Sequence, residues 1–162
     1  MALPSVNPEH PFSVVTIGEG ADQQTITTRL VAGGSAAGGV QPMDGLNCSA
    51  GNPGYCTCIT TDSQGLSFWG ASVTLQTSWN FDYSTVWTNI GQGKSSSADW
   101  PNHWENFDLW TSGAGTPYAY SDLTANLMSG IGWASVEDGS IHMWHQIDAW
   151  GNCTPYANWH TG

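Results

Sequence analysis

Two stretches of this chain repeat one pattern of aromatic, amide and carboxylate residues. Residues 104–110 read WENFDLW and residues 144–150 read WHQIDAW, so both follow Trp-x-(Asn/Gln)-(Phe/Ile)-Asp-(Leu/Ala)-Trp. The tetrapeptide Thr-Pro-Tyr-Ala follows each copy. The match indicates an internal repeat, with copies at 104–119 and 144–157 and a weaker third copy near 69–87.

Both clear copies alternate with the two-residue period of a β-strand, which sends successive side chains to opposite faces. One face of each copy is suited to a core. Its residues are Glu105, Phe107 and Leu109 in the first copy and His145, Ile147 and Ala149 in the second. The opposite face of each copy carries two indoles with an amide and a carboxylate between them. Its residues are Trp104, Asn106, Asp108 and Trp110 in the first copy and Trp144, Gln146, Asp148 and Trp150 in the second.

Length and composition favour one all-β domain. A chain of 162 residues can bury about 70% of its unfolded surface in a single core. Charged residues make up 9% of the chain and hydrophobic residues 40%, with ten Trp, which predicts a folded protein with a neutral, hydroxyl-rich surface. We expect residues 1–162 to form one β-sandwich or a repeat-built β-barrel, with at most one short helix.

Strand and turn signals place the expected elements along the chain. The expected strands are 12–17, 25–31, 67–77, 79–87, 104–110, 132–136 and 140–150. We expect loops over 32–42 and 44–58, a mobile connection over 91–98, a helix over 121–128 and a tight turn at Glu137-Asp138-Gly139. Asp99-Trp100-Pro101 could begin one helical turn, but the second copy contains no proline within its strand, which favours a strand over 104–110.

The four cysteines are expected to form disulfides. Cys56 and Cys58 lie too close together for an easy mutual bridge, so each should pair with Cys48 or Cys153. Such bonds persist in an oxidising compartment, which favours a secreted protein. A zinc site is disfavoured because the chain has no CxxC pair.

Charge and hydropathy exclude several partners. Thirteen acidic residues against Arg29 and Lys94 give a net charge of -11, which repels nucleic acid and anionic membranes. The sequence has no apolar run of about 18 residues that would span a bilayer, and residues 1–11 contain no signal-peptide core. His103, His142 and His145 form neither HxH nor HExxH, so we expect no metal and no cofactor.

The repeated faces have the chemistry of sugar recognition. A pyranose stacks its C–H face on an indole, and its hydroxyls pair with short amide and carboxylate side chains. We therefore predict a secreted, lectin-like carbohydrate-binding protein with two or three equivalent shallow sites. The expected ligand-binding residues are Trp104, Asn106, Asp108, Trp110, Tyr118, Trp144, Gln146, Asp148, Trp150 and Tyr156.

Three alternatives remain open at this stage. The repeated tryptophans could be core residues, with Asp108 and Asp148 bonded to local backbone. The protein could be a secreted toxin or effector whose indoles enter a lipid interface or contact a protein partner. It could also be a small glycoside hydrolase that uses Asp108 with Asp148, or Glu105 with Asp108. The similarity of the two copies argues against an enzyme, because a catalytic acid and nucleophile need different surroundings.

Overall fold

Alternation of buried and exposed side chains runs along the strands and gives each sheet one face for the core. In the strand Tyr118–Ser129, for example, Ala119, Leu123 and Leu127 are completely buried while Tyr118 and Tyr120 are exposed. The computed structural model describes residues 1–20, 23–32, 48, 53–66, 69–131 and 136–161, and β-strands are the regular elements in this part of the chain.

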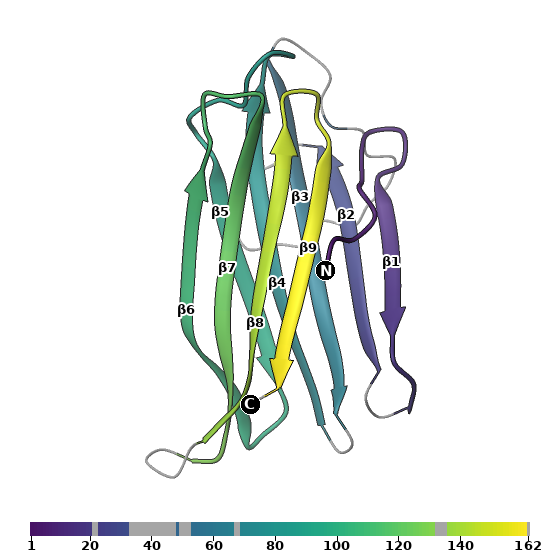
Figure 1. Ribbon diagram of the computed structural model, residues 1–162, viewed down its shortest axis with the longest axis vertical. Helices are drawn as coiled ribbons and strands as arrows, with labels where there is room; N and C mark the ends of the chain where they lie inside the picture. The colour runs from purple at the N-terminus through teal and green to yellow at the C-terminus, as the bar shows by residue number, and fades with distance from the viewer. Residues whose placement is uncertain (21–22, 33–47, 49–52, 67–68, 132–135, 162) are drawn as a thin grey trace.

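The strands form two antiparallel sheets that lie face to face (Figure 1). The five-stranded sheet contains, in spatial order, β1 (Phe12–Ile17), β2 (Gln24–Ala32), β3 (Gly54–Leu66), β4 (Trp69–Phe81) and β5 (Gly91–Ala98). The four-stranded sheet contains β6 (Asn102–Ser112), β7 (Tyr118–Ser129), β8 (Val136–Asp148) and β9 (Cys153–Thr161). Within each sheet, every strand pairs with the next in sequence, and the named strands change sheet once, between β5 and β6. This arrangement confirms the all-β prediction and selects the β-sandwich over the barrel.

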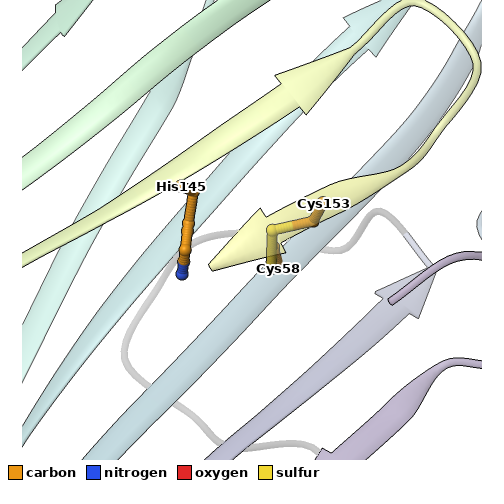
Figure 2. Close-up of side chains that lie close together, drawn as sticks. All are labelled: Cys58, His145 and Cys153. Carbon is orange, nitrogen blue, oxygen red and sulfur yellow. A yellow bond between two sulfur atoms is a disulfide. The ribbon is translucent and has the colours of Figure 1, made fainter. Parts of the chain in front are cut away.

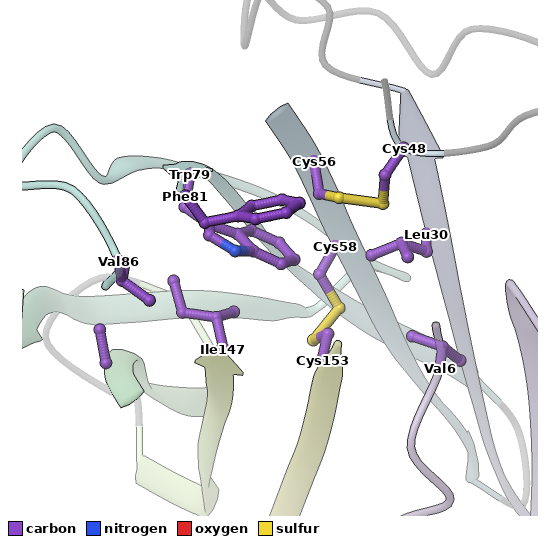
Figure 3. Close-up of a cluster of buried hydrophobic side chains, with 11 residues drawn as sticks. Val6, Leu30, Cys48, Cys56, Cys58, Trp79, Phe81, Val86, Ile147 and Cys153 are labelled. Atoms are coloured by element: carbon purple, nitrogen blue, oxygen red, sulfur yellow. A yellow bond between two sulfur atoms is a disulfide. The ribbon is translucent and has the colours of Figure 1, made fainter. Parts of the chain in front are cut away.

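Two disulfides lie in the core at one end of the sandwich (Figure 3). Cys48 pairs with Cys56, and Cys58 pairs with Cys153, as the sequence spacing allowed. The second bond joins β3 to β9 and therefore ties one sheet to the other. The residues packed with the cysteines are Val6, Leu30, Trp79, Phe81, Val86, Ala119 and Ile147.

The first six residues extend the four-stranded sheet. Val6 and Cys153 exchange backbone hydrogen bonds of 2.8 and 2.9 Å, and the Leu3 amide donates to the Pro155 carbonyl. Leu3 and Val6 are buried. The open edge of β9 is therefore covered by the chain's own N-terminal segment, which keeps that edge from pairing with another chain.

The helix expected over 121–128 is wrong, because this segment lies inside β7. Leu123 and Leu127 are four residues apart, a spacing that fits a helix face and also fits one face of a strand, since four is an even number. The pairing of β7 with β6 and with β8 decides between the two.

Two expected connections also proved to be strand. Residues 91–98 form the edge strand β5, in which the Ser97 hydroxyl is 2.8 Å from that of Ser72 on β4. Glu137-Asp138-Gly139 lies within β8, where the register shift opposite Leu127 and Met128 accommodates the extra residue as a bulge. The loop expected over 32–42 and the first part of the loop expected over 44–58 lie largely outside the described residues. The loop expected over 54–58 is wrong, because β3 begins at Gly54 and pairs there with β4.

The strand expected over 79–87 stops at Phe81, where a turn begins. Asp82 accepts hydrogen bonds from the backbone amides of Thr85 and Ser84. These bonds and one from the Ser84 hydroxyl hold the pKa of Asp82 below its ordinary value. The carboxylate thus caps the turn that leads the chain away from β4.

Candidate functional site

The outward side of the four-stranded sheet collects aromatic rings from four strands, and we call it the aromatic face. Alternation along β6 to β9 directs these side chains away from the core. The aromatic face comprises Trp110, Tyr118, Tyr120, Asp122, His142, Trp144, Gln146 and Tyr156, with Asp108, Thr124 and Asn158 beside them.

One cross-strand row forms the middle of the aromatic face. Trp110 on β6 is paired with Asp122 on β7, Asp122 with Trp144 on β8, and Trp144 with Tyr156 on β9. The rings of Trp144 and Tyr156 stack with centroids 4.6 Å apart and planes 4° from parallel. His142 lies 4.6 Å from Trp144 and 6.0 Å from Trp110, so four rings follow one another across the sheet.

Stacking gives the rings of this row different accessibility. Trp144 has an aromatic neighbour in both His142 and Tyr156, and it is half-buried. Trp110, at the end of the row, is 40% exposed. Trp144 therefore packs between its neighbours, whereas Trp110 leaves part of its ring open to solvent.

Polar side chains fix the rings in place. The Asp122 carboxylate lies 3.0 Å from Nε2 of His142, and the Tyr156 hydroxyl donates to Oε1 of Gln146 over 3.5 Å. The Asp122 side chain is 13% exposed, while that of His142 is 39% exposed. Hydrogen-bonding groups therefore lie beside the rings of His142 and Tyr156 on the aromatic face.

A second aromatic pair lies at one end of the aromatic face. The rings of Tyr118 and Trp150 are 6.0 Å apart and are 48% and 45% exposed. Gly113 permits the β6–β7 turn before Tyr118, because its φ is +78° and an added Cβ would lie 2.8 Å from the Tyr118 carbonyl oxygen.

Asp148 is occupied by its own turn. One carboxylate oxygen accepts the backbone amides of Trp150 and Asn152, each over 2.9 Å, and the other accepts the Asn152 side-chain amide over 2.7 Å. Asp148 therefore positions Trp150 instead of offering a free carboxylate, as the packing alternative anticipated for this residue. Asp108 is exposed on β6 and makes no side-chain hydrogen bond within the described part of the chain.

The prediction that Trp104 shares a face with Trp110 is wrong. A β-bulge between Glu105 and Asp108, with Asn106 at a φ of +53°, reverses the alternation midway along β6. Trp104 consequently faces inward, meets Trp159 edge-on at 5.8 Å and donates from Nε1 to the Ser97 carbonyl. Asn106 lies at the bulge, exposed to solvent.

The copies of the repeat are therefore not equivalent sites. Trp104 lies inward where Trp144 lies outward, and Trp110 lies on a strand where Trp150 lies on a turn. In the weaker copy, Trp79 is completely buried and donates from Nε1 to the Asp148 carbonyl. The aromatic face is instead one surface to which both clear copies contribute.

The residues expected from the sequence do not include three residues of the aromatic face: Tyr120, Asp122 and His142. Residues 118–122 read YAYSD, and their alternation would have placed Tyr118, Tyr120 and Asp122 together if 121–128 had been taken as a strand. His142 was considered only as a metal ligand. Its position two residues before Trp144 on a strand was the signal that placed it on the same face.

Among the described residues, His145 lies with Cys58 and Cys153 in a group whose ligand atoms are close enough together for a metal site (Figure 2). Its ring lies within 4.8 Å of the sulfur atoms of Cys58 and Cys153, but those sulfurs are joined as a disulfide. Both ring nitrogens are 2.8 Å from hydroxyls, Nδ1 from Thr77 and Nε2 from Thr60. Burial lowers the pKa of His145 to about 3, so the ring is neutral and serves the core.

Asp108 and Asp148, one of the carboxyl pairs considered for hydrolysis, do not assemble into a dyad between the two copies. Asp108 is aligned with Thr124 on β7 and Asp148 with Tyr118, six residues away, which separates them by roughly 20 Å along the sheet. Glycoside hydrolysis needs carboxyls about 5 to 9.5 Å apart. Burial does raise the pKa of Asp62 to about 6, but this residue is 1% exposed between the sheets.

The aromatic face contains no fixed positive charge. The two basic residues lie on the other sheet, Arg29 on β2 and Lys94 on β5, where the Lys94 ammonium is 3.2 Å from the centre of the Phe107 ring.

None of the described residues forms a helix that is long and apolar enough to span a bilayer. No family model, curated protein or solved structure matches this chain.

Proposed function

We propose that this protein binds carbohydrate through the aromatic face. One observation carries the proposal: exposed rings of Trp110, Tyr118 and Trp150 lie on the same surface as the hydrogen-bonding groups of Asp122 and Gln146. Sugars need this combination, because their C–H faces are apolar and their edges are hydroxylated.

The layout favours an extended glycan over a single sugar. Trp110 is aligned with Asp122 on β7, four residues from Tyr118, so the two exposed aromatic groups lie roughly 13 Å apart. A chain of a few sugar residues spans that distance. Each contact is weak by itself, and several contacts to one chain raise the affinity together.

Charge favours a neutral glycan and disfavours the membrane alternative. Glu105, Asp108 and Asp122 lie among or beside the rings, and no Lys or Arg occurs in β6 to β9. An anionic glycan or lipid headgroup would meet like charge, and insertion of the rings into a bilayer would strip water from the carboxylates at high cost. Two disulfides are compatible with a secreted location, which we propose with the function.

A glycan array with matched variants tests the proposal. The test variant is Trp110→Ala/Trp150→Ala, which removes an exposed indole from each end of the aromatic face. The control is Trp100→Ala, because Trp100 is 79% exposed and lies in the β5–β6 connection outside the face. Circular dichroism and thermal unfolding establish that all three proteins are folded before arrays are compared.

We expect the wild type and Trp100→Ala to bind the same neutral glycans, and the double variant to lose at least tenfold in affinity. Silence of the wild type across a broad array contradicts carbohydrate binding. Equal binding by the double variant moves the site away from the aromatic face. Leakage of neutral liposomes without any sugar dependence supports the toxin alternative instead.

A further inference from the structure

A pocket lies on the outward side of the five-stranded sheet, away from the aromatic face. Its volume is about 460 Å³, within the range of roughly 300 to 1,000 Å³ typical of ligand pockets. Strands β3 and β4 contribute one part of its lining, and the β4–β5 connection with the first residue of β5 contributes the other. The lining residues are Tyr55, Ser78, Asn80, Thr88, Asn89, Ile90 and Gly91.

Backbone hydrogen bonds hold the two parts of this lining together. The Trp87 amide donates to the Asn80 carbonyl over 2.9 Å, which returns the connection to the end of β4. The Ile90 amide donates to the Thr88 carbonyl over 3.2 Å, and Ile90 packs against the core cluster of Figure 3. These bonds fix the β4–β5 connection beside the end of β4, which lowers the entropy cost of binding a ligand there.

The pocket offers hydrogen bonds without charge. Its lining includes two side-chain amides and the hydroxyls of Ser78, Thr88 and Tyr55, and no Asp, Glu, Lys or Arg is among the lining residues. The Ser78 hydroxyl is 2.8 Å from that of Thr57. Thr88 and Asn89 make no side-chain hydrogen bond within the described part of the chain, and the bond from the Asn80 amide to the Gly54 carbonyl is long at 3.5 Å. The half-buried Tyr55 adds an aromatic side chain to the same lining.

We propose that this pocket binds one neutral sugar residue, such as the terminal hexose or N-acetylhexosamine of a glycan. Amides and hydroxyls both donate and accept, so they match a ring of hydroxyls, and the lining tyrosine suits the apolar face of the sugar. An anion would find no counter-charge in a protein of net charge -11. A purely apolar ligand would leave the side-chain amide of Asn89 without a partner where the ligand covers it.

This site does not rest on the aromatic face. The pocket is lined by residues of β3 to β5 and of the β4–β5 connection, whereas the aromatic face belongs to β6 to β9. These strands form two different sheets, which lie face to face (Figure 1). A protein that uses both surfaces holds two glycan chains at once.

Gly91 allows the pocket to be filled from its own lining. A Cβ built at Gly91 would meet the Ser78 Cβ at 3.6 Å, an ordinary contact, so Gly91→Leu extends a side chain beside the pocket lining without a clash at its Cβ. Gly93 provides the matched control, because it lies two residues further on the same face of β5 and its Cβ would meet that of Gln76 at the same 3.6 Å. Asn89→Ala, at an exposed position, is a second test variant that places no bulk in the sheet.

The test measures the backbone amide NMR shifts of the full chain while methyl glycosides are added up to tens of millimolar. The probes are those of glucose, galactose, mannose and N-acetylglucosamine, with glucuronate as the anionic comparison. We expect saturable shifts at Asn89 and Gly91 with at least one neutral probe, retained in Gly93→Leu. In Gly91→Leu and Asn89→Ala the midpoint should rise at least fivefold.

Three outcomes overturn this proposal: no shift at the pocket with any neutral probe, an unchanged midpoint in both test variants, or equal shifts with glucuronate. Trp110→Ala/Trp150→Ala should leave the pocket titration unchanged, so loss of one site is distinguishable from loss of the other.

Discussion

Asp62 connects the polar interior of the sandwich to the pH dependence of its stability. The residue is 1% exposed on the inner side of β3, and its two oxygens accept hydrogen bonds from the side-chain amides of Gln24 and Gln64 over 2.7 and 2.8 Å. Burial disfavours the carboxylate more than these two bonds favour it, so the pKa rises from 3.8 to about 6. We predict that Asp62→Asn changes how stability depends on pH.

The sign follows from proton binding. Between about pH 4 and pH 6 the folded protein holds a proton on Asp62 that the unfolded chain has already released, so the contribution of Asp62 to stability falls as pH rises. Each pKa unit corresponds to about 1.36 kcal/mol, so the difference between 3.8 and about 6 amounts to roughly 3 kcal/mol. The contribution is fully present below about pH 4 and is lost above about pH 6.

The assay is equilibrium urea unfolding of the wild type and Asp62→Asn from pH 3.5 to 7.5. The difference between the two proteins isolates Asp62, because other titrating groups are common to both. We expect the free energy of unfolding of Asp62→Asn, relative to the wild type, to rise by roughly 3 kcal/mol between pH 4 and pH 7. A difference that stays constant over this range, or that falls with pH, refutes the reasoning.

Three further perturbations test the described contacts. Removal of the Cys58–Cys153 disulfide, which spans 95 residues, should lower the free energy of unfolding by about 4 to 5 kcal/mol. Removal of the Cys48–Cys56 disulfide, which spans 8 residues, should lower it by about 2.5 kcal/mol. Urea unfolding of the two double Cys→Ala variants measures both losses and their order. Trp79→Phe should cost roughly 2 to 4 kcal/mol in the same assay, because it leaves a gap in the core and removes the hydrogen bond to the Asp148 carbonyl. Asp148→Ala should cost roughly 1 to 3 kcal/mol and increase the amide hydrogen exchange of Asn152, since three hydrogen bonds within the β8–β9 turn are lost; unchanged exchange contradicts the capping role.

The fold class was predictable because it depends on local alternation and on cysteine spacing. The strand expected over 12–17 matches β1, and the alternation over 25–31 and 67–77 lies within β2 and β4 wherever these strands are described. The sequence could not choose a sandwich over a barrel. That choice depends on where the sheet breaks, and the break falls at the short β5–β6 connection. The sequence there, Asp99-Trp100-Pro101, indicates a local turn but not a change of sheet.

The misassigned segments have one cause in common: pairing outweighed local preference. Residues 91–98, GQGKSSSA, are poor strand formers, but backbone bonds to β4 and the hydroxyl pair of Ser72 and Ser97 hold them in the sheet. The Asp-Gly step at 138–139 has the chemistry of a tight turn, and the structure uses it for a bulge, another place where a strand needs unusual backbone geometry.

The candidate site shows why a repeat in sequence need not be a repeat in structure. In a regular strand, the face to which each side chain points follows from its position, because successive side chains alternate. One inserted residue therefore reverses the face of every later side chain on the strand. In β6 the bulge at Asn106 does this, and it separates Trp104 from Trp110 although their spacing matches that of Trp144 and Trp150. The bulge also turns Trp110 outward, beside the row that continues through Trp144. The two copies of the repeat therefore contribute different side chains to one aromatic face because of the bulge at Asn106. Strict two-residue alternation cannot predict such a bulge.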